Sequence, residues 1–302
     1  MNDPLDPSGP PHRTVIGRHG VKIAYVTLGQ GERTLLLANG LGGRLYAWDP
    51  LVQALRDRYR IITWDYRGLF DSEAPARRRH LSVPDHAEDA MAILDAEGVD
   101  RAVFCGWSMG VQVSLEAATL YPDRLAGLVL LNGTYGHVFT SAFQPYFRVP
   151  FASAWGHAVV DTLLSRPGIT SLLGTMAPIG SHGIAALLWA ISGASPATLK
   201  PLLGRYTREI FSERTLPNYL RLFQELDAHS VYHHLRDIHT PALVISGAWD
   251  WLTPAYQSHV MARRLPDAEA VHLHRASHFV LLERPEVVIP AIERFLTARA
   301  LW

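Results

Sequence analysis

The sequence has a single cysteine, no net charge and no long apolar run, and each of these absences removes a class of protein. One cysteine, Cys105, excludes an internal disulfide framework and a zinc site built from clustered thiolates. Lys and Arg together number 28, as do Asp and Glu, so no basic field exists to attract a nucleic acid. We therefore expect neither a disulfide-stapled domain nor a nucleic-acid-binding protein.

Signals for membrane insertion and secretion are also lacking. The run at residues 184–191 is among the longest apolar stretches, and it is far shorter than the roughly 18 residues that a membrane-spanning helix needs. Residues 1–13 are rich in Pro and Asp and carry no apolar stretch of the kind found in secretory signals. These features predict a soluble cytoplasmic protein without a transmembrane segment.

Short apolar runs and helix-like segments alternate along the 302 residues. Around His19-Gly20, two β-like segments within residues 15–28 indicate a hairpin. The later runs are continuously apolar, as expected of parallel strands that helices cover on both faces. These runs are residues 34–38, 60–65, 102–105, 125–131, 242–246 and 270–273. The alternation predicts an α/β fold with a mostly parallel sheet and helices on both of its faces.

Residues 135–235 interrupt this alternation. They contain no clear buried strand, and apolar side chains recur at helical spacing, as at Tyr219, Leu222, Phe223 and Leu226. The pattern predicts a mostly helical cap, residues 135–235, inserted into one core domain made of residues 1–134 and 236–302. A helical subdomain that plays no part in binding is the alternative interpretation.

The pentapeptide Gly106-Trp107-Ser108-Met109-Gly110 follows an apolar run and opens a helical stretch. A G-x-S-x-G pattern in this context places the serine on a tight turn between a strand and a helix. Flanking glycines allow the turn without a Cβ clash, and the helix N-terminus directs free amides at a developing oxyanion. Ser108 is therefore the candidate nucleophile.

A serine nucleophile needs a base that a carboxylate orients. Asp250 stands just past a predicted strand, although a turn aspartate that caps its own loop would look the same. His278 lies on the loop after the last predicted strand, whereas His272 and His274 fall inside that strand. We therefore predict a triad of Ser108, Asp250 and His278, in a chain order that is typical of one architecture.

These motifs resemble those of the α/β-hydrolase superfamily, specifically its serine esterase and lipase-like members with a helical cap, over nearly the whole chain. A further segment, Asn39-Gly40-Leu41-Gly42-Gly43, resembles the family's His-Gly-x-Gly loop. The resemblance implies an oxyanion hole formed by the backbone amides of Leu41 and Met109. Asn39 replaces the family's histidine, a change that affects the support of the loop and leaves the backbone donor in place.

Another segment, Asp65-Tyr66-Arg67-Gly68, resembles a family motif in which a glycine stands where this chain has Phe70. We interpret this segment as structural, with Arg67 joining loops beneath the site. The run Arg77-Arg78-Arg79 is interpreted as a solvated loop face, and no anion site is expected there.

By resemblance, the expected activity is hydrolysis of carboxylic esters through an acyl-enzyme, without a metal or an organic cofactor. Trp107, Trp249 and Trp251 suggest an apolar pocket for a small uncharged ester with a medium acyl chain or an aromatic group. The same triad serves acyl transfer to alcohols, lactone hydrolysis and C–C bond hydrolysis, and some relatives only bind ligands. A serine at position 108 argues against epoxide hydrolases and dehalogenases, which carry aspartate there.

Overall fold

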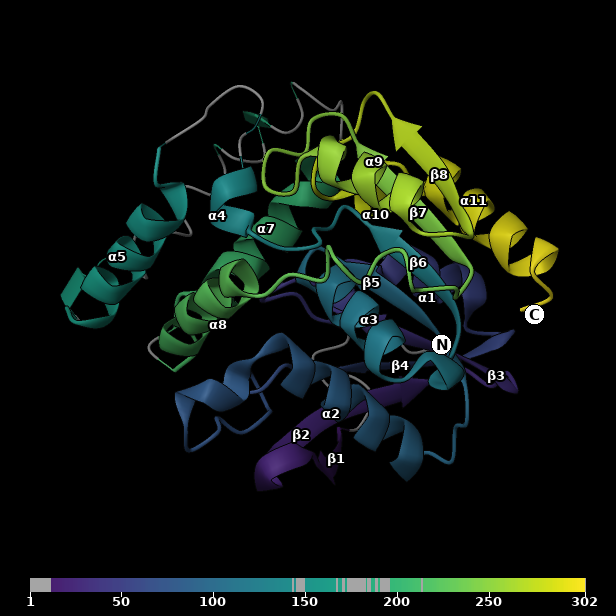
Figure 1. Ribbon diagram of the computed structural model, residues 1–302, viewed down its shortest axis with the longest axis horizontal. Coiled ribbons are helices and arrows are strands. Elements are labelled where there is room, and N and C mark those ends of the chain that lie inside the picture. Colours follow the sequence, from purple (N-terminus) through teal and green to yellow (C-terminus); the bar gives the residue numbers. More distant parts are fainter. Residues whose placement is uncertain are drawn as a thin grey trace.

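The computed structural model describes residues 12–142, 150–166, 196–212 and 214–301, together with residues 144, 168, 169, 172, 183, 186, 187 and 190. Its strands form one eight-stranded sheet in the order β1-β2-β4-β3-β5-β6-β7-β8 (Figure 1). The β1–β2 and β2–β4 pairs are antiparallel, and every other pair is parallel. The strands are β1 (Arg13–Ile16), β2 (Lys22–Leu28), β3 (Arg33–Ala38), β4 (Tyr59–Trp64), β5 (Ala102–Trp107), β6 (Leu125–Leu131), β7 (Ala242–Gly247) and β8 (Ala268–Leu273).

Helices cover both faces of this sheet (Figure 1). One face carries α2 (Val83–Ala96), α3 (Met109–Leu120) and α9 (Ala255–Arg264), and the other carries α1 (Asp49–Leu55), α10 (Val280–Glu283) and α11 (Pro285–Ala298). Short 3-10 turns complete the core: η1 (Arg18–Gly20), η2 (Leu45–Trp48), η3 (Arg78–Leu81) and η4 (Pro122–Arg124). None of the helices in the described ranges is both long enough and apolar enough to span a bilayer.

Strand β5 shows why the continuous apolar runs predict doubly covered strands. All of its residues are buried. Phe104 belongs to the apolar cluster beneath α2 and α3, whereas Val103 and Cys105 belong to the cluster beneath α1 and α11. Side chains of a strand point alternately to its two faces, so each face needs its own apolar residues. The predicted α/β architecture with a mostly parallel sheet is confirmed.

The thiol of Cys105 provides a check on this burial. Its side chain is 0% exposed, and burial raises the pKa of the thiol to about 12. Because the thiolate is the reactive form, we expect a thiol reagent such as dithionitrobenzoate to leave the folded protein unmodified at pH 8. In guanidinium chloride one equivalent should react. Rapid labelling of the folded chain would contradict the buried position of β5.

The described part of the segment between β6 and β7 is mostly helical, as the sequence predicts. It contributes α4 (Val138–Ser141), α5 (Ala152–Leu164), α7 (Pro196–Ile210) and α8 (Leu216–Ala228), which lie at one end of the sheet (Figure 1). Part of the predicted cap, including most of the apolar run at 184–191, lies outside the described residues, as do residues 1–11. The division into a core domain and a cap of residues 135–235 stays a prediction.

Arg67, in the turn after β4, is hydrogen-bonded to helix α2 and to the 3-10 turns η1 and η3. Its side chain is fully buried, and its Nε and Nη2 atoms each lie 2.6 Å from an oxygen of Asp89 on α2. The guanidinium also donates to the carbonyls of Arg18 and His80, both at 3.1 Å. Burial raises the pKa of Asp89 to about 6, and the hydrogen bonds from Arg67 act in the opposite direction.

We expect Arg67→Met to lower the free energy of unfolding by about 4 kcal/mol, because it leaves a buried carboxylate without its partner. Urea denaturation at pH 8, where Asp89 of the wild type is ionised in both the folded and the unfolded state, measures this loss. Arg77→Met is the matched control, since Arg77 is exposed, and it should change stability by at most about 0.5 kcal/mol. A loss below about 1 kcal/mol for Arg67→Met would show that the fold does not depend on this ion pair.

Candidate active site

Ser108 occupies a sharp turn between β5 and α3. Its backbone has φ 56° and ψ −116°, a conformation that costs a non-glycine residue about 1–3 kcal/mol. Gly106 and Gly110 have to be glycines because backbone atoms of neighbouring residues approach both of them closely. A Cβ on Gly106 would lie 2.4 Å from the Gly110 carbonyl oxygen, and one on Gly110 would lie 1.9 Å from the Ala38 carbonyl oxygen. The motif therefore presses the start of α3 against the end of β3 and leaves Ser108 partly exposed.

Asp250 and His278 lie together at the carboxyl ends of β7 and β8. The Nδ1 atom of His278 is 2.9 Å from Oδ2 of Asp250, and both residues are buried. A carboxylate only accepts hydrogen bonds, so this contact places the proton on Nδ1 and leaves Nε2 available as a base. The other oxygen of Asp250 accepts the amides of Leu252 and Thr253 at 3.0 and 2.9 Å. Asp250 thus both caps its own loop and faces the imidazole.

The two neighbouring histidines are directed elsewhere. His272 lies inside β8, and its Nδ1 is 3.0 Å from the hydroxyl oxygen of Ser246. The expectation that His274 also lies inside the strand is wrong, since β8 ends at Leu273. The rings of His272 and His274 contact each other at a centroid distance of 5.4 Å.

A glycine loop, residues 39–43, runs from the end of β3 toward η2. The Gly43 amide donates to the Gly40 carbonyl at 2.8 Å, which closes a tight turn. Across a trans peptide the N–H points opposite to the carbonyl, so the Leu41 amide points away from this turn. Among the described residues, neither the Leu41 amide nor the Met109 amide donates a hydrogen bond. The loop and the first turn of α3 thus offer two unpaired amides.

Asn39 supports the glycine loop from below. Its Nδ2 donates to the Trp64 carbonyl at 2.7 Å, and its Oδ1 accepts the Trp48 indole N–H at 2.8 Å. The Asn39 carbonyl also accepts the Tyr66 hydroxyl at 2.7 Å. Asn39 is 2% exposed. At the position of the family's histidine, it therefore supports the loop through buried hydrogen bonds.

Trp107 connects three parts of the site. Its indole N–H donates to the His278 carbonyl at 2.9 Å, and its ring lies 5.5 Å from the imidazole, between centroids. The same ring limits the glycine loop, because a Cβ on Gly40 or Gly43 would lie 2.6 or 2.8 Å from it. Only 8% of Trp107 is exposed, which suits a packing role beneath the site.

The structure places Trp249 and Trp251 on the loop after β7, on either side of Asp250. Trp249 is 36% exposed. Within the described ranges, neither indole makes a ring contact with His278 or Trp107. Their part in a substrate pocket stays a prediction.

Two supporting residues escape prediction from the sequence. Asn132, buried at the end of β6, donates to the Ser277 carbonyl at 2.5 Å and accepts the Gly247 amide at 3.1 Å. Glu283 of α10 accepts the Ser277 amide at 2.5 Å. Together they fix the loop that carries His278 to the end of β7. The only signal for Asn132 is its position, a polar residue directly after a buried strand.

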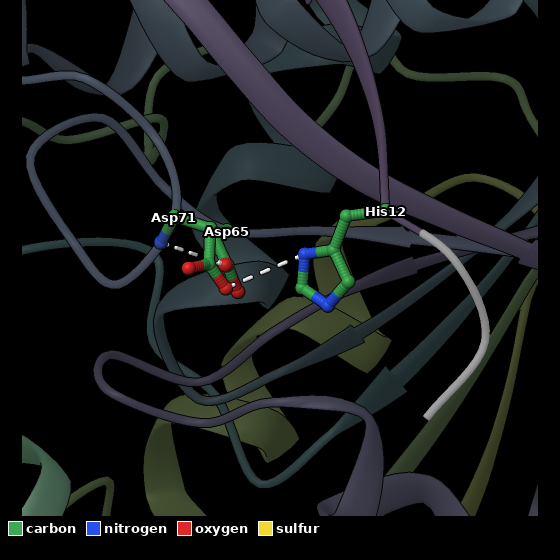
Figure 2. A group of neighbouring side chains, drawn as sticks. All are labelled: His12, Asp65 and Asp71. Atoms are coloured by element: carbon green, nitrogen blue, oxygen red, sulfur yellow. Dashed lines mark hydrogen bonds and ion pairs between the residues drawn. The ribbon is translucent and has the colours of Figure 1, made fainter. Parts of the chain in front are cut away.

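One group of side chains among the described residues offers ligand atoms close enough for a metal ion: His12, Asp65 and Asp71 (Figure 2). Arg44 already contacts these carboxylates, at 3.1 Å from Asp65 and 2.5 Å from Asp71. Burial raises the pKa of Asp65 to about 6, and Arg44 beside it lowers it. The carboxylates thus pair with a fixed cation, so the cluster serves to tie Arg44, next to the glycine loop, to the loop after β4.

Comparison with known proteins places this geometry in a wider group. Residues 33–156 match the family model of the alpha/beta hydrolase fold. A putative carbamate hydrolase, RutD, of Caulobacter segnis is 29% identical over 269 residues, which cover 88% of this chain and 92% of the relative.

Solved structures show the same likeness. A hydrolase from Pseudomonas aeruginosa superposes with a TM-score of 0.73 and 25% identity, over 94% of this chain and 98% of that one. The enol-lactonase from Burkholderia xenovorans superposes with a TM-score of 0.71 and 25% identity, over 95% of this chain and 100% of that one. The chain therefore has the α/β-hydrolase fold.

Proposed function

We propose that this α/β-hydrolase cleaves carboxylic esters through an acyl-enzyme formed on Ser108. The observation that carries the proposal is a serine on a strained turn, together with the amides of Leu41 and Met109, which donate to none of the described residues. Donors preorganised in this way stabilise charge that appears only in the transition state. The Asp250–His278 pair supplies the base that a serine hydroxyl needs.

In the proposed mechanism, Nε2 of His278 takes the proton of Ser108 as the hydroxyl oxygen attacks the ester carbonyl. The carbonyl oxygen becomes an oxyanion that accepts hydrogen bonds from the two amides, each worth about 3–4 kcal/mol in comparable sites. Protonated His278 then gives its proton to the leaving alcohol. Water, deprotonated by the same imidazole, attacks the acyl-enzyme and releases the acid and Ser108.

The substrate class that we propose is a small uncharged ester. Leu41 in the glycine loop, and Met109 and Trp107 on either side of the serine in sequence, are apolar and buried. An ionised substrate would lose hydration there without gaining a charged partner. The names of the relatives, an enol-lactonase and a putative carbamate hydrolase, suggest a cyclic ester and a carbamate as further substrates to test.

Two measurements on the purified protein test the proposal. p-Nitrophenyl esters from acetate to palmitate, with a hemisuccinate ester as the charged comparison, give the chain-length optimum. A γ-lactone and a p-nitrophenyl carbamate extend the panel. An alkyl fluorophosphonate, followed by peptide mass spectrometry, identifies the nucleophile.

We expect turnover of neutral esters and phosphonylation at Ser108 alone. A preference for the hemisuccinate ester would overturn the uncharged substrate class. Absence of both ester turnover and Ser108 labelling would overturn the proposed activity. Labelling of Ser108 with faster cleavage of the lactone or the carbamate would retain the mechanism and replace the ester as the substrate.

A further inference from the structure

Two helices of the insertion rest on the glycine loop. Ile210 of α7 and Tyr219 of α8 pack against Gly42, where a Cβ would lie 2.5 Å from the first side chain and 3.0 Å from the second. Gly42 has φ +78°, and the loop contains two further glycines, Gly40 and Gly43. A loop with this many glycines has large conformational freedom when nothing holds it. The contacts from α7 and α8 therefore limit the shapes that the loop can adopt.

A hydrogen bond reinforces this contact. The Tyr206 hydroxyl of α7 donates to the Leu41 carbonyl at 2.5 Å. The Tyr219 hydroxyl of α8 also interacts with the Tyr206 hydroxyl. Burial raises the pKa of both phenols, which keeps them protonated donors at any physiological pH. A hydrogen bond thus joins α7 to the loop, with Tyr219 of α8 beside its donor.

We infer that Tyr206 is a positioning residue of the proposed reaction: by holding the Leu41 carbonyl, it fixes the adjoining Leu41 amide in the direction of the oxyanion. The inference rests on the proposed function and adds a condition to it. The amides can stabilise the oxyanion fully only while α7 is seated on the glycine loop.

Removing the hydroxyl alone tests this role. Tyr206→Phe keeps the buried ring, and we expect kcat for p-nitrophenyl butyrate to fall about tenfold, the usual scale for one hydrogen bond. KM should change less than about twofold, because the lost alignment matters only after the oxyanion forms. The inhibition constant of a trifluoromethyl ketone, which forms a tetrahedral adduct, should rise by the same factor as kcat/KM falls.

Two variants control for general effects of losing a hydroxyl. Tyr121→Phe removes one at the opposite end of α3, far from the loop, and should leave kcat unchanged. Tyr219→Phe removes the neighbouring hydroxyl but leaves the bond between Tyr206 and Leu41, so kcat should fall by a smaller factor, about threefold. Thermal unfolding of each variant shows whether the fold is retained.

An unchanged kcat in Tyr206→Phe would overturn the inference, and so would a rise in KM without a fall in kcat, which indicates a direct contact with substrate. Either result, combined with phosphonate labelling of Ser108 and ester turnover by the wild type, leaves the proposed function intact. Failure of labelling and turnover in the wild type is a different outcome and overturns the proposed function itself.

Discussion

Replacing Ser108 with alanine is expected to lower kcat for p-nitrophenyl butyrate by about six orders of magnitude, by analogy with other serine triads. The substitution removes the only atom that can form the acyl-enzyme, while the amides of Leu41 and Met109 and the Asp250–His278 pair remain. Cleavage would then depend on direct attack by water. Steady-state kinetics with active-site titration of the wild type gives the ratio.

Stability measurements separate this loss of chemistry from damage to the fold. Alanine keeps a Cβ, so Ser108→Ala retains the strained turn at φ 56° and should unfold at the same temperature as the wild type. Ser108→Gly relieves the strain and should be about 1 kcal/mol more stable while equally inactive. Residual activity above about 1% of the wild-type value in either variant would point to a different nucleophile.

The positions of the central strands were predictable because burial on both faces leaves a local signature. Residues 102–105 are continuously apolar for the reason that the structure shows, with Phe104 in one core cluster and Cys105 in the other. The order of the strands was not predictable in this way. β4 lies between β2 and β3, an arrangement set by crossovers of the chain that local periodicity does not encode.

The candidate triad was predictable to the extent that each residue follows a strand. Chemistry gathers at the carboxyl ends of parallel strands, so Ser108, Asp250 and His278 could be picked from short segments. The supports of the site depend on contacts between distant segments and leave little trace in the sequence. Asn132 and Ser277 are 145 positions apart, and Tyr206 and Leu41 are 165 apart.

Phe70 adopts a backbone conformation that its residue type does not indicate. The residue has φ 50° at the position where the family motif has glycine. Its ring lies under the Arg44 guanidinium, 4.8 Å from carbon to centroid. This contact and the ion pairs of Arg44 hold the turn in a conformation that the side chain alone disfavours.

The substitution Asp250→Asn is expected to lower kcat by about four orders of magnitude while leaving the loop after β7 in place. The reason is that the two carboxylate oxygens have different hydrogen-bond partners. Oδ1 accepts the backbone amides of Leu252 and Thr253, and only an oxygen can replace it there. The carboxamide that this substitution introduces must therefore turn its –NH2 toward His278. Nδ1 would then have to accept a hydrogen bond from this –NH2, so the imidazole hydrogen would lie on Nε2, which could no longer act as a base.

The neighbouring hydroxyl of Thr253 fits the same orientation. Its oxygen lies 2.7 Å from Oδ2 of Asp250 and 2.8 Å from the Asn132 carbonyl, so it can donate to the carbonyl and accept from the new –NH2. Asp250→Asn should thus fold as the wild type does, with kcat and the rate of phosphonate labelling of Ser108 falling together. Asp250→Ala is the contrasting variant, because it also leaves the amides of Leu252 and Thr253 without their hydrogen-bond acceptor. It should lose stability as well as activity. Labelling of Asp250→Asn at the wild-type rate would mean that Asp250 does not set the tautomer of His278, and its buried position would then serve the loop alone.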